Sequence, residues 1–148
     1  MLTVGSLSPA WTAVDQDGKA RSSADYLGSW LLLYFYPKDD TPGCTIEACG
    51  FRDAWHRLST VVRIVGVSSD SPECHQKFIT KYSLPFPLLA DTDAVLRSAF
   101  KADGTQYPKR VTFLIRPSGH IEKVYEGFDC QNHADDIERD LVALHVLT

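Results

Sequence analysis

The chain has 148 residues, and its 15 lysines and arginines against 19 aspartates and glutamates give a formal net charge of −4. This length predicts one domain over residues 1–148, and a composition of 44% hydrophobic and 23% charged residues argues against disorder. A mildly acidic chain without a lysine or arginine cluster is unsuited to nucleic acid or an anionic membrane, and no apolar run approaches the ~20 residues that span a bilayer. The N-terminus lacks the basic and apolar regions of a secretory signal, so we expect a cytoplasmic protein that binds neither nucleic acid nor membranes.

The first predicted elements are strands. Residues 11–14, followed by an Asp-Gln-Asp-Gly turn at 15–18, indicate a small hairpin near the N-terminus. Two longer apolar runs, 30–36 and 61–67, do not alternate between apolar and polar residues. Such continuous runs are typical of strands that are buried on both faces of a sheet.

A helix is predicted after each of these two buried strands. Thr41 is suited to the N-cap and Pro42 to the first helical position, and apolar residues then recur at helical spacing as far as Leu58. The second helix begins in the same way, with Ser71 as its cap and Pro72 as its first residue. Strand, helix, strand and helix joined by short loops predict a βαβ unit with a right-handed crossover.

The pattern changes in the second half of the chain. Residues 93–100 indicate a short helix, and 111–115 with 121–125 predict an antiparallel hairpin that has Gly119 in its turn. A last helix begins near Asn132. Its buried face is expected to contain Ile137, Leu141 and Leu144. A βαβα half followed by ββα predicts an α/β, thioredoxin-like fold: a mixed central sheet with helices on both faces and an N-terminal hairpin extension.

Cys44 is the residue most suggestive of chemistry, because it falls in the first turn of the helix that Thr41 is expected to cap. Free backbone N–H groups and the helix dipole stabilise an anion there, so the nucleophilic thiolate is favoured. Gly43 lets backbone N–H groups approach a substrate, the Thr41 hydroxyl can donate or accept, and Pro37 can shield the pocket from water. The alternative is a small buried hydrophobic side chain, as free cysteines often are.

Cys49 follows five residues later on the same predicted helix. On an ideal helix five residues advance about 7.5 Å along the axis, which separates the two Cα atoms by roughly 9 Å. A disulfide requires Cα atoms closer than about 7 Å, so Cys44 and Cys49 can bond only if the first turns unwind. The spacing suits a cycle between a reduced, folded state and an oxidised, locally unfolded one. A packed core thiol is the alternative for Cys49.

The segment from Pro37 through Thr41 to Cys44 resembles the P-x-x-x-T-x-x-C motif of peroxiredoxins. Its continuation, Cys-Thr-Ile-Glu-Ala-Cys at 44–49, resembles the bacterioferritin comigratory protein, or Q-type, branch of that family. Further matching segments follow in order along nearly the whole chain. They are Ser-Ser-Asp-Ser-Pro-Glu at 68–73, Lys-Phe at 77–78, Leu-Pro-Phe-Pro-Leu-Leu-Ala-Asp at 84–91, Arg-Val-Thr-Phe-Leu-Ile at 110–115 and Asn-His at 132–133.

The resemblance implies a thiol peroxidase that reduces hydrogen peroxide and organic hydroperoxides. Cys44 would attack the O–O bond and become a sulfenic acid, while Thr41 and the Cys44 N–H hold the peroxide oxygens. Arg110 would stabilise the thiolate and polarise the departing oxygen, and Glu47 would orient Arg110. Cys49 would resolve the sulfenic acid as an intramolecular disulfide, which a thioredoxin-like dithiol reduces again. Relatives of this branch are often monomers, so a monomer is expected.

Two cysteines depart from the family pattern. Cys74 stands where the branch has serine, and the neighbouring Glu73 disfavours a thiolate, so a structural role is expected, with resolution of Cys44 as the alternative. Cys130 is expected to be a bystander thiol in a loop. The loop before Arg110 is also shorter than is usual for the branch.

Other interpretations of the same residues are weaker. A zinc site built from Cys44, Cys49, Cys74 and His75 would lack a second closely spaced pair of ligands, and the Cys-x-x-Cys motif of disulfide oxidoreductases is absent. The peroxidase chemistry that the resemblance implies requires no metal or organic cofactor, so none is expected. Residues 38–40 are expected to form a solvated loop, and His133 to belong to the last helix cap. A thioredoxin-fold redox sensor, switched by oxidation of Cys44, remains the functional alternative.

Overall fold

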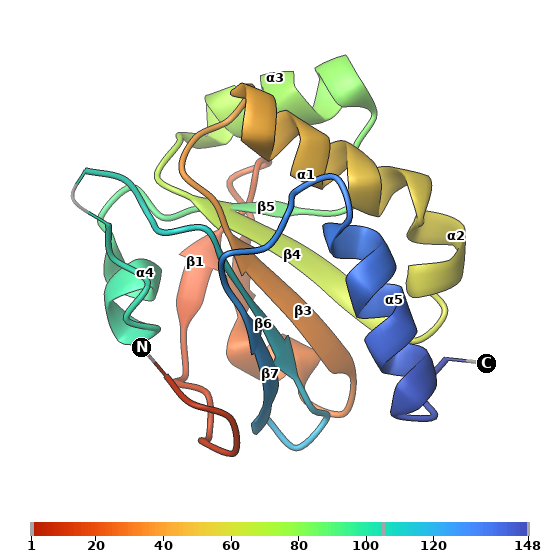
Figure 1. Ribbon diagram of the computed structural model, residues 1–148. Helices are drawn as coiled ribbons and strands as arrows, with labels where there is room; N and C mark the ends of the chain where they lie inside the picture. The colour runs from red at the N-terminus through yellow and green to blue at the C-terminus, as the bar shows by residue number, and fades with distance from the viewer. Residues whose placement is uncertain (1, 105, 148) are drawn as a thin grey trace.

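The computed structural model describes residues 2–104 and 106–147, which include a five-stranded mixed sheet in the order β5-β4-β3-β6-β7 (Figure 1). Strands β3, β4 and β5 are parallel, whereas β6 pairs antiparallel with both β3 and β7. The strands are β3 (Trp30–Phe35), β4 (Val62–Ser68), β5 (Leu88–Ala90), β6 (Val111–Ile115) and β7 (Ile121–Tyr125). A separate antiparallel pair, β1 (Thr12–Val14) and β2 (Ala20–Ser22), precedes them.

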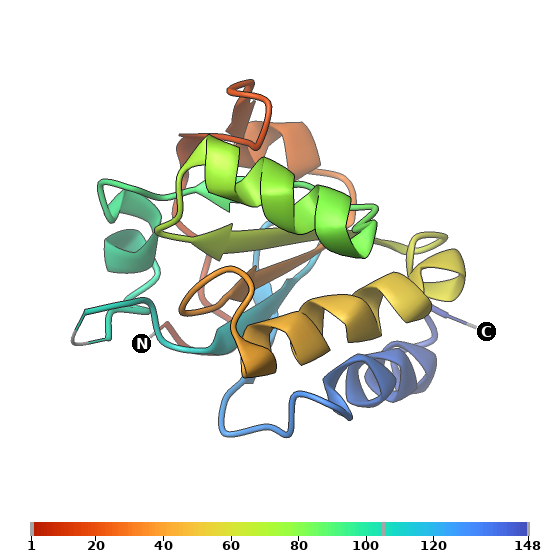
Figure 2. The same ribbon diagram turned by 90° about the horizontal axis from the view of Figure 1, so that it is seen from above.

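Five α-helices and one short 3-10 helix, η1 (Ser23–Tyr26), lie around the sheet in the described part of the chain. Helices α1 and α5 lie side by side (Figure 2). The α-helices are α1 (Pro42–Asp53), α2 (Trp55–Leu58), α3 (Pro72–Tyr82), α4 (Val95–Ala99) and α5 (His133–Ala143). Among the residues described, no helix combines the length and the apolar character that a membrane crossing requires.

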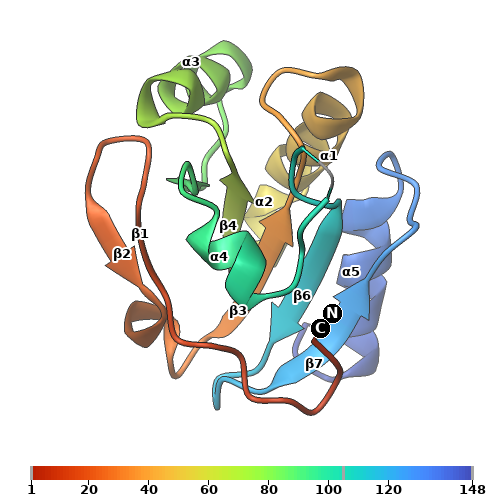
Figure 3. The ribbon, with the colours of Figure 1, turned by 90° about the vertical axis from the view of Figure 1, so that its left-hand side faces the viewer.

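Strand β3 is buried on both faces, and its side chains alternate between two hydrophobic cores. Leu32 and Tyr34 point into a core shared with α1, α3 and α5. Leu33 and Phe35 point into the opposite core, which contains side chains of α4 and of the segments near β1 and η1. Figure 3 shows α4 in front of the sheet and α1 and α5 behind it. The apolar run therefore predicted a central strand correctly.

The expected α/β, thioredoxin-like architecture is confirmed, including the N-terminal hairpin and the hairpin of β6 and β7. Strand β5 was not predicted, because its three residues follow Pro85 and Pro87 and form a strand only through pairing with β4. The helix that was expected to continue to Leu58 breaks at Ala54, which separates α1 from α2.

The prediction of Leu144 as a buried residue of the last helix is wrong. Helix α5 ends at Ala143, and Leu144 is 36% exposed. The chain turns after the helix, with His145 at a positive φ of 60°, and Leu147 enters the core instead. A residue just beyond a helix end does not follow the helical spacing from which its burial was inferred.

Candidate active site

Cys44 is the third residue of α1 and is almost completely buried, with 1% of its surface exposed. The first bond of the helix is donated by the Thr45 N–H to the Thr41 carbonyl oxygen, at 2.8 Å. The N–H groups of Gly43 and Cys44 therefore lie outside the helical hydrogen-bond ladder. Cys44 itself is part of this first turn, where the free donors and the positive end of the helix dipole favour an anion.

Thr41 occupies the N-cap position of α1, but its side chain makes no capping bond. Its hydroxyl donates instead to the Lys38 carbonyl oxygen at 2.8 Å, so the predicted N-cap position of Thr41 is confirmed although its side chain does not cap the helix. Pro42 starts the helix without needing a hydrogen-bond partner. Pro37 lies in the same loop, between β3 and α1, and is half-buried.

Arg110 connects two of the predicted site residues. Its Nη2 donates to the Cys44 sulfur at 3.2 Å, and its Nη1 donates to Glu47 Oε1 at 2.8 Å. Arg110 immediately precedes β6, whose first residue pairs with the last residue of β3. Because α1 follows β3, this pairing brings Arg110 and the start of α1 to the same edge of the sheet. Residue spacing could not show this contact, which the resemblance to peroxiredoxins had implied.

Gly43 accounts for the close approach of the guanidinium to the helix. A Cβ atom built at Gly43 would lie 3.1 Å from Arg110 Nη2 and 3.6 Å from its Cζ. That separation is tighter than ordinary van der Waals contact, so a side chain there would push the guanidinium away from Cys44. The sequence suggested that Gly43 lets backbone N–H groups approach a substrate. In the structure, the missing side chain lets the Arg110 guanidinium approach the helix.

Glu47 lies one turn after Cys44 and is only 1% exposed. Burial raises its pKa to about 7, although the charge of Arg110 and the hydrogen bond from it act in the opposite direction. Its second oxygen, Oε2, has no hydrogen-bond partner in the described chain and lies 3.8 Å from His133 Nε2. Glu47 therefore has one strong contact, with Arg110, and this contact orients the Arg110 guanidinium toward Cys44.

His133 is a site residue that the sequence analysis missed. It was assigned to a helix cap, yet it is the first residue of α5, is 1% exposed and shares a hydrogen bond of 2.9 Å with Thr112 Oγ1. Its ring stacks on Phe128, with centroids 3.5 Å apart. Burial lowers its pKa to about 4, so the ring is neutral at pH 7 and forms no ion pair with Glu47. The Asn-His match at 132–133 was the available signal.

The four cysteines are all free thiols. Cys49 is half-buried on the continuous helix α1, and burial raises its pKa. Cys74 is exposed at the start of α3, where its N–H donates to the Ser71 hydroxyl. Cys130 lies in the loop between β7 and α5, as expected. Its sulfur is 3.9 Å from the position that a Cβ on Gly43 would take, which places it near the first turn of α1.

The residues described contain one group of three potential metal ligands: Asp39, Asp70 and His75. Both ring nitrogens of His75 are already engaged, Nδ1 with Asp39 at 2.6 Å and Nε2 with the Leu89 carbonyl oxygen at 2.9 Å. Asp70 in turn accepts from the Asp39 N–H at 2.9 Å. These contacts tie the loop before α1 to α3, so the expectation that Asp39 is solvated is wrong.

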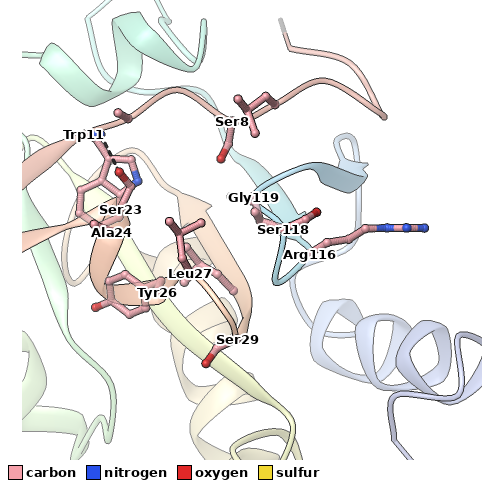
Figure 4. A pocket seen from close by; sticks show the side chains of 14 residues that line it. Ser8, Trp11, Ser23, Ala24, Tyr26, Leu27, Ser29, Arg116, Ser118 and Gly119 are labelled. Carbon is pink, nitrogen blue, oxygen red and sulfur yellow. Dashed lines mark hydrogen bonds between the residues drawn. The ribbon is translucent and has the colours of Figure 1, made fainter.

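A cleft of about 380 Å³ opens far from these residues, beside Trp11, Tyr26 and Leu27 (Figure 4). It includes Leu31 and Ile115, which pair with each other at the opposite end of β3 and β6 from Arg110. Four residues of a strand span about 13 Å, so the cleft and Cys44 lie at opposite edges of the sheet. Its lining is mainly apolar, and it has no contact with the cysteines.

The arrangement defines a class: a thioredoxin-like protein with a buried cysteine at a helix start, in contact with an arginine. The AhpC/TSA family matches residues 4–124. A Bcp-type peroxiredoxin of Coxiella burnetii is 41% identical over 145 residues, covering 92% of this chain and 96% of the relative. Peroxiredoxin Bcp of Escherichia coli K12 is 38% identical over 143 residues, covering 90% and 92% respectively.

The fold is shared with solved peroxiredoxins as well. The crystal structure of a cysteine-to-serine mutant of PrxQ from Xylella fastidiosa superposes with a TM-score of 0.90 at 30% identity and covers 98% of both chains. The chain belongs to the AhpC/TSA family and, with these relatives, is a thiol-dependent peroxidase of the peroxiredoxin type. Its similarity is to the Bcp and Q-type members.

Proposed function

We propose that Cys44 is the nucleophile that attacks the peroxide, and the observation that carries this proposal is the 3.2 Å contact between its sulfur and Arg110 Nη2. The cation and the free N–H groups of the first turn of α1 favour the thiolate. Attack of the thiolate on one peroxide oxygen breaks the O–O bond and leaves a sulfenic acid on Cys44. The other oxygen departs as hydroxide or alkoxide and takes up a proton to give water or an alcohol.

Arg110, Thr41 and the backbone form the peroxide-binding set in this proposal. Arg110 is held toward the sulfur by Glu47, so its positive charge is in place before charge develops on the departing oxygen. The Cys44 N–H and the Thr41 hydroxyl are the additional hydrogen-bonding groups, and Gly43, without a side chain, lets the guanidinium lie close to the first turn of α1. Pro37 limits the access of water. No metal or organic cofactor takes part in these steps.

Cys49 is the resolving cysteine in this proposal. Its thiol condenses with the sulfenic acid, water leaves, and an intramolecular disulfide forms. Because α1 is continuous over both residues, its first turns must unwind before the two sulfurs can meet. A thioredoxin-like dithiol then reduces the disulfide. We further propose that the enzyme is a cytoplasmic monomer, since resolution within one chain requires no second subunit.

The test is replacement of Cys44 by serine. Cys44→Ser is expected to abolish peroxide consumption with thioredoxin or dithiothreitol as the reductant, whereas Cys74→Ser, at an exposed thiol, is expected to retain it. Full turnover by Cys44→Ser would overturn the assignment of the nucleophile. Fewer than about one turnover per thiol pair in the unsubstituted protein would instead favour the redox sensor.

A further inference from the structure

Cys130 occupies a position over the first turn of α1. Its sulfur lies 3.9 Å from where a Cβ of Gly43 would be, and that same point is 3.1 Å from Arg110 Nη2. The nitrogen is in turn 3.2 Å from the Cys44 sulfur. The two thiols therefore approach the same guanidinium, one from α1 and the other from the loop between β7 and α5.

The charges around Cys130 also place it in the active site. Burial raises the pKa of the Cys130 thiol and Arg110 lowers it, whereas the charges of Glu47 and Cys44 raise it. These charged groups are the ones that surround the Cys44 sulfur, which agrees with the position of Cys130 over the first turn of α1. An independent observation concerns Glu47, which belongs to the same group of side chains. Its buried Oε2 has no hydrogen-bond partner in the described chain, so the site contains an unpaired acceptor.

We propose that Cys130 is a second resolving thiol, which forms a disulfide with Cys44 while helix α1 stays folded. The inference rests on the proposed role of Cys44 as the nucleophile. The sulfur of Cys130 attacks the sulfenic sulfur of Cys44, the S–O bond breaks, and an S–S bond forms. The departing hydroxide combines with the Cys130 thiol proton to leave as water, so no further oxidant is needed.

The local structure explains why this route avoids unwinding. Cys130 is in an irregular loop, which includes Gly127 at a positive φ of 61°. The stack of Phe128 on His133 holds the loop against the start of α5. Cys130 and Gln131 precede Asn132, the N-cap of α5, so a shift of these two residues can bring the Cys130 sulfur toward Cys44 without breaking a hydrogen bond of α1. The Cys49 sulfur cannot reach Cys44 in this way, because Cys49 is part of helix α1.

The experiment uses the Cys49→Ser variant. It is treated with one equivalent of hydrogen peroxide at low micromolar protein concentration, alkylated with N-ethylmaleimide and digested with trypsin without reduction. We expect a cross-linked pair of peptides, 39–52 with 124–139, which carry Cys44 and Cys130. Adding the change Cys130→Ser is expected to remove this product and to increase dimedone labelling of Cys44 by about tenfold, because the intramolecular competitor is lost.

The matched control is Cys74→Ser in the Cys49→Ser background, which is expected to leave the cross-linked pair unchanged, since Cys74 is exposed on α3. If dimedone labels Cys44 in Cys49→Ser and no cross-link forms, the role of Cys130 is overturned, whereas the role of Cys44 as the nucleophile stands. A cross-link confined to covalent dimers on a non-reducing gel would overturn it as well. Absence of any sulfenic acid on Cys44 in every variant would overturn the proposed function itself.

Discussion

Gly43 and Arg110 fit together so closely that a single methyl group would separate them. The Cβ of an alanine at position 43 would lie 3.1 Å from Arg110 Nη2, the nitrogen that also contacts the Cys44 sulfur. A residue with no side chain therefore determines how near the cation comes to the nucleophile. This relationship links helix α1 to the loop before β6.

Gly43→Ala is expected to lower kcat/KM for peroxide by about tenfold, the cost of weakening one charge-assisted hydrogen bond. Gly50→Ala, in the same helix, is the control. A Cβ there meets only Ala134 Cβ at an ordinary 3.7 Å, so activity is expected to stay unchanged while the free energy of unfolding rises by about 0.5–1 kcal/mol. Equal activity of the two variants in a peroxide assay would contradict the role of Gly43.

Arg110→Lys is expected to reduce kcat/KM by about 100-fold, because one ammonium group cannot reach both Cys44 and Glu47 in the geometry of the planar guanidinium. The rate of Cys44 alkylation by iodoacetamide is expected to fall as well, which separates loss of the thiolate from loss of peroxide binding. Arg116→Lys, at the other end of β6 and bonded to Glu122, is the control and is expected to keep both rates. A fully active Arg110→Lys enzyme would refute the proposal.

Glu47 and His133 are expected to give opposite pH dependences of stability. Folding raises the pKa of Glu47 from 4.5 to about 7, so its contribution to stability is present below pH 4.5 and is lost as pH rises toward 7. Folding lowers the pKa of His133 from 6.5 to about 4, so its contribution is present above pH 6.5 and is lost as pH falls toward 4. The two effects nearly cancel between pH 4.5 and 6.5.

Single substitutions should expose each effect. Relative to the unsubstituted protein, Glu47→Gln is expected to gain stability as pH rises from 4.5 to 6.5, and His133→Gln to lose it, each with a slope of up to about 1.4 kcal/mol per pH unit. Urea unfolding at several pH values measures both slopes. Slopes of the same sign would show that the buried environments of the two groups are described wrongly.

Oxidation through Cys49 is expected to cost helical structure, because the Cα atoms of Cys44 and Cys49 must come closer than α1 allows. Peroxide treatment of Cys130→Ser is expected to increase amide exchange over residues 42–49 and to reduce the far-ultraviolet helix signal. Peroxide treatment of Cys49→Ser is expected to leave both unchanged. A protected helix α1 in oxidised Cys130→Ser would rule out the Cys44–Cys49 disulfide.

Much of the fold could be predicted because its signals are local. The apolar run of β3, the proline at the start of α1 and the glycine turn between β6 and β7 each act within a few residues of the chain. Strand β5 could not be predicted in this way, since three residues become a strand only when β4 lies beside them. Leu144 was misplaced because helical spacing does not show where α5 ends.

The amino-acid sequence by itself determined that Cys44 stands at a helix start behind Thr41 and Pro42, and that Cys49 follows at a spacing an intact helix cannot bridge. The tertiary structure alone decided which distant groups reach the sulfur. Antiparallel pairing of β6 with β3 brings Arg110 to the start of α1, and the packing of α5 brings His133 and Cys130 beside it. Helix geometry arises from neighbouring residues, whereas these contacts depend on how the sheet pairs segments more than sixty residues apart.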